Sequence, residues 1–176
     1  MQEILKAALA EIDAKKREIV TRTLALSESE RGHSSGNQWS AAQVVEHLVM
    51  FEEYLQTGHN KAIEAGNSLK PGLKGKIFGG IVGSMVRAKI RFGTTKEFEP
   101  TLDIDLNKRL QDWNEIRETL VSALDEISAL DLNETFAIHP IAGPLTAETT
   151  VRMISLHLDY HIRFFPGNPA AEVKST

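Results

Sequence analysis

Two histidines near the end of the chain, His157 and His161, have the residue type and the spacing to hold a metal ion. They are four positions apart, so on an α-helix their side chains project from one face. The same face carries Val151, Ile154 and Leu158, which directs both imidazoles into an apolar core. An unpaired buried polar group costs about 1–3 kcal/mol. A shared metal ion is one way to satisfy both rings.

The pair differs from the zincin motif, in which a glutamate follows the first histidine. Leu158 occupies that position, and Asp159 points toward another face of the helix. The chain also has no cysteine, which excludes disulfides, thiolate ligands and a cysteine nucleophile. A third ligand must therefore be a histidine, aspartate or glutamate from another part of the chain.

His47 is the best candidate for that third ligand, because it lies in the apolar stripe of a well-marked helix. Ser40 and Gln43 form an S-x-x-Q capping box, and Trp39 precedes the cap at the position of a hydrophobic staple. These signals predict a helix from Ala41 to about Ala65. His47 falls within its apolar face, which is formed by Val44, Leu48, Phe51 and Leu55.

Simple helix geometry can bring the three histidines to one level. His47 lies about 10 Å into its helix, and His157 and His161 lie roughly 13 and 8 Å before the expected helix end at Pro166. If the two helices run antiparallel, the three rings meet near one end of a bundle. Three neutral imidazoles with an open position are usual for catalytic Zn²⁺, and octahedral Ni²⁺ or Fe²⁺ also fits. Three separately hydrogen-bonded core histidines are the alternative that the spacing leaves open.

The sequence predicts helices and loops for the rest of the chain as well. Apolar residues at three/four spacing predict further helices, and the Gly- and Pro-rich stretches predict loops. The helices are expected at about Glu3–Leu26, Leu73–Arg91, Asp103–Leu130 with Asp103 as cap, and from Thr146 as cap to Pro166; the loops at Ser27–Gln38 and Asp131–Pro144. No strand is expected. The prediction is an all-α four-helix bundle with an extra crossover helix between the second and third long helices, as one domain over residues 1–166 with a flexible tail at 167–176.

Composition narrows the class of protein further. A chain of 176 residues suits one domain with a real core. A net charge of −4 argues against general nucleic-acid binding. The N-terminus has no basic start followed by an apolar run, so no signal peptide is expected. No uncharged apolar stretch approaches the roughly 20 residues that span a bilayer. We therefore expect a cytoplasmic protein without stable membrane insertion.

The crossover is strongly basic. Residues 67–96 contain seven basic side chains and no acidic one. The favoured interpretation is a solvated helix that covers the bundle. The alternatives are a cationic rim that attracts anionic ligands and a surface for reversible membrane contact.

Three sequence blocks together resemble the DinB/YfiT-like superfamily. They are the W-S-x-x-Q-x-x-x-H-L block from Trp39 to Leu48, the H-P-I-A-G-P-L-T block from His139 to Thr146, and the final His157-x-x-x-His161. The resemblance implies a four-helix bundle with up-down-down-up topology and a divalent metal held by His47, His157 and His161. One departure is Tyr160, because the family's last motif often has paired histidines there.

The resemblance also implies a class of activity. Several family members are thiol-dependent transferases or isomerases that use bacillithiol, mycothiol or glutathione, and many have no assigned activity. We therefore expect a divalent-metal-dependent enzyme (Zn, Ni or Fe), a thiol-dependent S-transferase or a hydrolase, that acts on a small electrophile. Catalytic and cofactor-binding residues other than the metal ligands are not identified. The alternatives are a non-catalytic, metal-stabilised binding module and a homodimer that uses the crossover helix as its interface.

Overall fold

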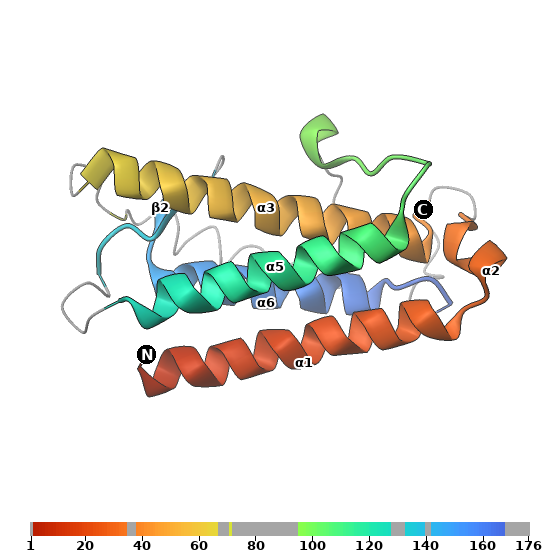
Figure 1. The fold of residues 1–176 in the computed structure, drawn as a ribbon, viewed down its shortest axis with the longest axis horizontal. Coiled ribbons are helices and arrows are strands. Elements are labelled where there is room, and N and C mark those ends of the chain that lie inside the picture. The colour runs from red at the N-terminus through yellow and green to blue at the C-terminus, as the bar shows by residue number, and fades with distance from the viewer. Residues whose placement is uncertain are drawn as a thin grey trace, which may run out of the picture.

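The computed structural model describes residues 2–34, 38–66, 71, 95–127, 133–139 and 142–167, and the protein is mostly helical. Four long helices lie side by side (Figure 1). In that view α3 and α5 run opposite to α1 and α6. The bounds of these helices are α1 Glu3–Ala25, α3 Ala41–Ala65, α5 Leu106–Asp125 and α6 Ala147–Arg163.

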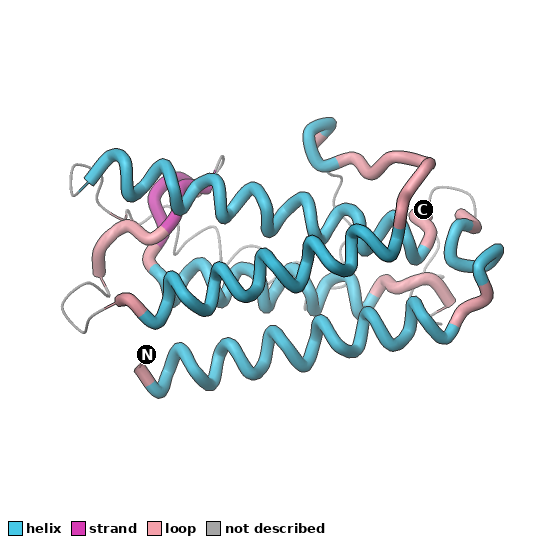
Figure 2. Tube along the Cα trace, viewed as in Figure 1, coloured by secondary structure: helices cyan, strands magenta, loops and turns pink. Residues whose placement is uncertain are grey.

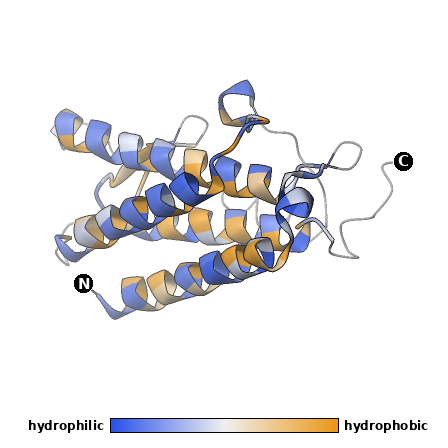
Figure 3. Cartoon of the chain, turned by 45° about the vertical axis from the view of Figure 1, so that its right-hand side comes forward, coloured by the Kyte–Doolittle hydropathy of each residue, from blue (hydrophilic) through white to orange (hydrophobic). Residues whose placement is uncertain are grey.

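The core lies where the apolar sides of the helices meet, which Figure 3 shows as orange ribbon faces directed toward one another. Leu5, Ile12 and Ile19 of α1 are fully buried, which confirms the three/four spacing read from the sequence. Val45 and Leu48 of α3 are buried with them. This packing fixes how α3 and α6 are rotated about their axes, and therefore where their histidines point.

The predicted start of α3 is confirmed. The Ser40 backbone N–H donates to Gln43 Oε1 at 3.0 Å, and the Gln43 backbone N–H donates to Ser40 Oγ at 3.2 Å. Thr146 caps α6 as predicted, since its Oγ1 accepts from the Thr149 N–H at 3.2 Å. Both caps satisfy N–H groups that would otherwise lack a partner in the first turn.

The predicted start and end of the third long helix were wrong. The helix covers Leu106–Asp125, and its cap is Asp105 rather than Asp103. Asp105 Oδ1 accepts from the Lys108 N–H at 3.0 Å. Either aspartate has suitable chemistry, but only Asp105 directly precedes Leu106, where the periodic apolar series begins.

Two short elements were missed in stretches predicted to be loops. Helix α2 (Glu28–Gly32) starts with its own capping box between Ser27 and Glu30. Strands β1 (Ala137–His139) and β2 (Gly143–Leu145) form an antiparallel hairpin, drawn in magenta beside α3 in Figure 2. Three-residue strands are too short to show an alternating pattern, and this is why the expectation of no strand was wrong here.

The hairpin packs against α3 at Gly58. A Cβ atom at this position would lie 2.5 Å from the Ile138 carbonyl oxygen, so the helix and the strand backbone can approach only because the residue is glycine. The contact places His139 and the start of α6 relative to α3.

Gly58→Ala should therefore destabilise the protein, although alanine is the better helix former. We expect a loss of about 1–3 kcal/mol, typical of overpacking, measured by urea unfolding. Gly32→Ala is the control, because a Cβ atom at this position would have nothing within 4 Å, and its stability should stay close to that of the wild type. Equal stability of the two variants would show that the hairpin yields to the extra methyl group.

The predicted crossover helix Leu73–Arg91, most of the basic stretch 67–96 and most of the tail lie outside the described residues. The expectation that the crossover forms a homodimer interface falls on the same residues. It stays a prediction.

Candidate metal centre

His47 of α3 and His157 and His161 of α6 converge as the sequence predicted. His157 Nε2 lies 3.1 Å from His47 Nε2 and 3.1 Å from His161 Nε2. Metal–nitrogen bonds of about 2.1 Å would separate ligand atoms by about 3.0 Å at a right angle and about 3.4 Å at the tetrahedral angle. Both 3.1 Å contacts lie in this range, and the three ligand atoms all lie within 4.8 Å of one another, so the group could hold a metal ion. In the part of the chain that the structure describes, this is the one group of three potential ligands close enough for a metal.

The partner of His47 fixes its tautomer. Its Nδ1 lies 2.7 Å from the carbonyl oxygen of Phe98, in the short 3₁₀ helix η2 (Lys96–Phe98). A carbonyl oxygen only accepts, so Nδ1–H is the donor and Nε2 carries the lone pair. A backbone carbonyl is one of the common partners of a metal-binding histidine in this role.

Hydrogen bonding alone does not satisfy the cluster. His157 Nε2 faces the Nε2 atoms of both His47 and His161, and one N–H can be aligned with only one of them. His157 Nδ1 is buried and makes no hydrogen bond to any residue that the structure describes. A cation bound by all three Nε2 atoms removes the conflict between the lone pairs. The three residues therefore could hold a metal ion.

Aromatic rings hold the imidazoles in place. The Trp39 indole lies 4.7 Å from the His47 ring and 6.1 Å from the His161 ring, measured between centroids, and is nearly parallel to the latter. Phe51 packs edge-on against His157 at 4.2 Å. From the sequence, Trp39 was predicted only to mark the helix start and Phe51 only to lie in the core. Their position beside the ligands follows from packing between helices, which one sequence does not show.

Burial keeps the cluster neutral. It lowers the pKa of His157 and of His161 well below the ordinary value of 6.5, and neighbouring histidines lower both further. The pKa of His47 is lowered for the same reason, partly offset by the Phe98 carbonyl. His157 as a residue is partly exposed, but its Nδ1 atom is buried. Neutral imidazole is the form that binds a metal.

These shifts predict how the stability of the metal-free protein depends on pH. In the unfolded chain the histidines titrate near 6.5, so below that pH the unfolded state binds more protons than the folded state. The contribution of these histidines to stability should therefore be constant above about pH 7 and fall as the pH drops below about 6.5, by up to about 1.4 kcal/mol per pH unit for each histidine. Urea unfolding in EDTA between about pH 7.5 and pH 5 measures this. A flat profile contradicts it.

The other histidines do not join the cluster. His139 lies in the hairpin, where its Nδ1 accepts from the Ala142 N–H at 3.1 Å, and burial lowers its pKa to about 4. His59 is half-buried, and its Nδ1–H donates to the Phe136 carbonyl at 2.6 Å. His33 is exposed.

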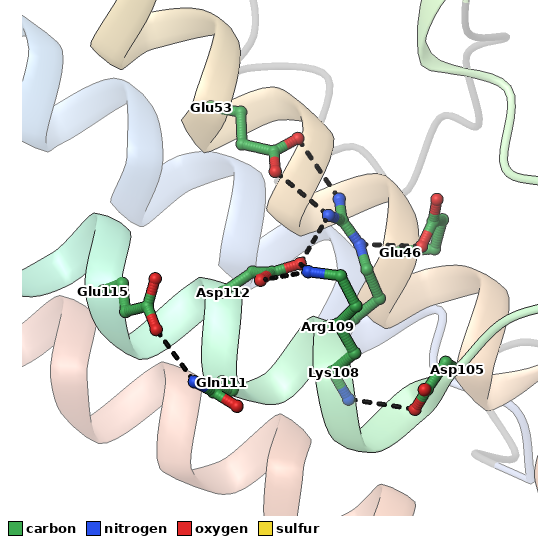
Figure 4. Close-up of polar contacts among 8 residues, drawn as sticks. All are labelled: Glu46, Glu53, Asp105, Lys108, Arg109, Gln111, Asp112 and Glu115. Carbon is green, nitrogen blue, oxygen red and sulfur yellow. Dashed lines mark hydrogen bonds and ion pairs between the residues drawn. The ribbon is translucent and has the colours of Figure 1, made fainter.

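The acidic residues next to the proposed ligands in the sequence form ion pairs with other helices. Glu46, which precedes His47, pairs with Arg109 Nε of α5 at 2.9 Å. Arg109 also binds Glu53 and Asp112, so it joins α3 to α5 (Figure 4). Asp159 pairs with Lys15 of α1 at 2.8 Å. These carboxylates tie the two ligand-bearing helices to their neighbours, and neither ion pair includes a histidine of the cluster.

A family model described as the DinB superfamily matches residues 11–165. The chain belongs to the DinB superfamily. The match includes all three clustered histidines and both ligand-bearing helices. No curated protein and no solved structure was found to match. Among the described residues of this DinB protein, no helix is both long enough and apolar enough to cross a bilayer.

Proposed function

We propose that the protein is a divalent-metal-dependent enzyme whose metal is held by His47, His157 and His161. The observation that carries the proposal is the pair of 3.1 Å contacts that His157 Nε2 makes with the Nε2 atoms of His47 and His161. When all three imidazoles are neutral, these two contacts cannot both be hydrogen bonds. Zn²⁺, Ni²⁺ and Fe²⁺ all accept histidine nitrogen. Three protein ligands leave a coordination position of the metal open for a further ligand, such as water or substrate.

Each residue has a separate task in this proposal. The Phe98 carbonyl holds the His47 ring by its Nδ1–H, and the Trp39 indole fixes the His47 and His161 rings from the side. Phe51 packs edge-on against the His157 ring and holds it in place. The bound cation supplies Lewis acidity, which lowers the pKa of a water or thiol and polarises a carbonyl.

The reaction class that we propose is thiol-dependent S-transfer to a small electrophile, with hydrolysis as the second choice. Because the chain has no cysteine, a reacting thiol must come from a low-molecular-weight cofactor.

The up-down-down-up topology, with the crossover as an extra helix over residues 73–91, is part of the same proposal. So are the domain limits 1–166.

Elemental analysis of the purified protein, followed by an activity screen, tests the proposal. The metal-loaded protein should transfer glutathione to an activated aryl halide, or cleave an aryl ester, faster than the EDTA-treated protein. Metal binding without a metal-dependent rate in either assay would reject the enzyme. Absence of metal binding at micromolar concentration would reject the metal centre as well.

A non-catalytic role is favoured by one feature, namely that the ligands come from two helices and a cation would join α3 to α6. In that case the metal raises the melting temperature, and neither the thiol nor the ester reaction depends on it.

A further inference from the structure

A cavity lies beside Trp39, whose indole also contacts two rings of the histidine cluster. Its volume is about 360 Å³, and Leu26, Ser29, Glu30, His33, Trp39 and Pro166 contribute to its lining. Binding pockets for small molecules usually begin at about 300 Å³. The lining residues come from the turn between α1 and α2, from α2, from the approach to α3 and from the end of α6. None of them belongs to the proposed metal ligands.

Part of the wall of this cavity is apolar and aromatic, and it is formed by Leu26, Trp39 and Pro166. Trp39 is half-buried and shared, because the same indole contacts the His47 and His161 rings. Leu26 and Pro166 are also only partly covered by protein. An indole face that is open to a cavity attracts flat apolar groups and also cations, through the negative face of the ring.

The charge at the rim is negative. Glu30 is the one charged side chain among the described residues that line the cavity. Its Oε2 accepts from the Ser27 backbone N–H at 2.8 Å, and this bonding with Ser27 lowers the pKa of Glu30. The carboxylate is therefore ionised at neutral pH.

The nearest cation along the chain does not neutralise this carboxylate by direct contact. Arg31 donates from Nε to the carbonyl oxygens of Thr23 and Leu26, at 3.1 and 2.9 Å, and from Nη2 to that of Leu24 at 2.8 Å. Its donors close the C-terminal end of α1. Glu30 is thus left as the charge that a ligand in the cavity meets.

We propose that this cavity binds a small primary amine with an apolar body, the ammonium group near Glu30 and the body against Trp39. The proposal goes beyond the metal centre and does not depend on it, because none of the lining residues is a proposed ligand.

Benzylamine and benzoate are suitable probes, because they share a ring and differ in the sign of their charge. Binding is followed in the metal-free, EDTA-treated wild type by the indole N–H signals in heteronuclear NMR. The chain has two tryptophans. Trp113 is fully buried and serves as the internal control. Benzylamine should shift the Trp39 signal saturably and leave Trp113 unchanged, and benzoate should bind about tenfold more weakly.

Two matched variants test the charge. Glu30→Gln keeps the capping box, since glutamine also serves at that position, and should weaken benzylamine binding by about three- to fivefold, as expected for an exposed ion pair. Glu28→Gln makes the same charge change on α2 outside the lining and should leave the affinity unchanged. Equal binding of both probes, equal effects of the two variants, or no saturable shift of Trp39 would each overturn the proposal. Metal content is measured separately, so these failures are distinct from failure of the metal centre.

Discussion

His157→Ala should abolish tight metal binding while leaving the helical circular-dichroism signal in place. His157 is central to the cluster because its Nε2 is the atom within 3.1 Å of both other ligands. Its removal leaves His47 on α3 and His161 on α6 without a bridging donor. We expect an affinity loss of at least about 100-fold, the upper range seen even for residues that only support a ligand. Isothermal titration with Zn²⁺ and Ni²⁺, together with elemental analysis, measures it.

The matched control is His33→Ala, which removes an exposed histidine outside the cluster. It should keep full metal stoichiometry. His47→Ala and His161→Ala should resemble His157→Ala, because a three-ligand site loses its geometry with any one member. If all four variants bind metal like the wild type, the three histidines are not its ligands.

The convergence of these residues was predictable because local signals fixed each helix separately. The capping box at Ser40 set where α3 begins, and the position of His47 in the apolar stripe set which face it occupies. On α6 the four-residue spacing did the same for His157 and His161. Each inference used only near neighbours in the chain, where helix periodicity is strict.

The surroundings of the site were not predictable in this way. The Phe98 carbonyl that fixes the His47 tautomer lies 51 positions away along the chain, in an irregular segment without a periodic pattern. Trp39 was assigned to a helix start, but its ring also lies against the cluster. Such contacts depend on how segments pack over one another, so a single sequence gives no signal for them.

The buried ion pair of α3 and α5 was missed for a related reason. Glu52 and Arg117 look like ordinary surface residues in a charged helix pattern. In the structure they are only 3% and 5% exposed, because three helices meet over them. Arg117 Nη2 donates to Glu52 Oε1 at 2.7 Å, and Nη1 reaches Asp13 Oδ1 of α1 at 3.3 Å.

Breaking this pair should have the largest effect on stability of any charge substitution considered. Glu52→Gln keeps the shape of the side chain but leaves the buried Arg117 guanidinium with only the partly exposed Asp13 carboxylate as countercharge, which costs up to about 3–5 kcal/mol. Glu53→Gln is the neighbouring control. Glu53 pairs with Arg109 from a position where its side chain is 43% exposed, so its loss should cost no more than about 1 kcal/mol. Urea unfolding of both variants measures the difference.

A double variant separates the cost of an unpaired charge from the value of the pair. Glu52→Leu combined with Arg117→Met removes both charges and replaces them with apolar groups of similar length. Because two buried charges must be desolvated before they attract one another, the double variant should recover most of the stability lost in Glu52→Gln. If the double variant is as unstable as Glu52→Gln, the pair itself stabilises the three-helix contact. Arg117, which also reaches Asp13, would then contribute to the packing of α1 against α3 and α5 directly.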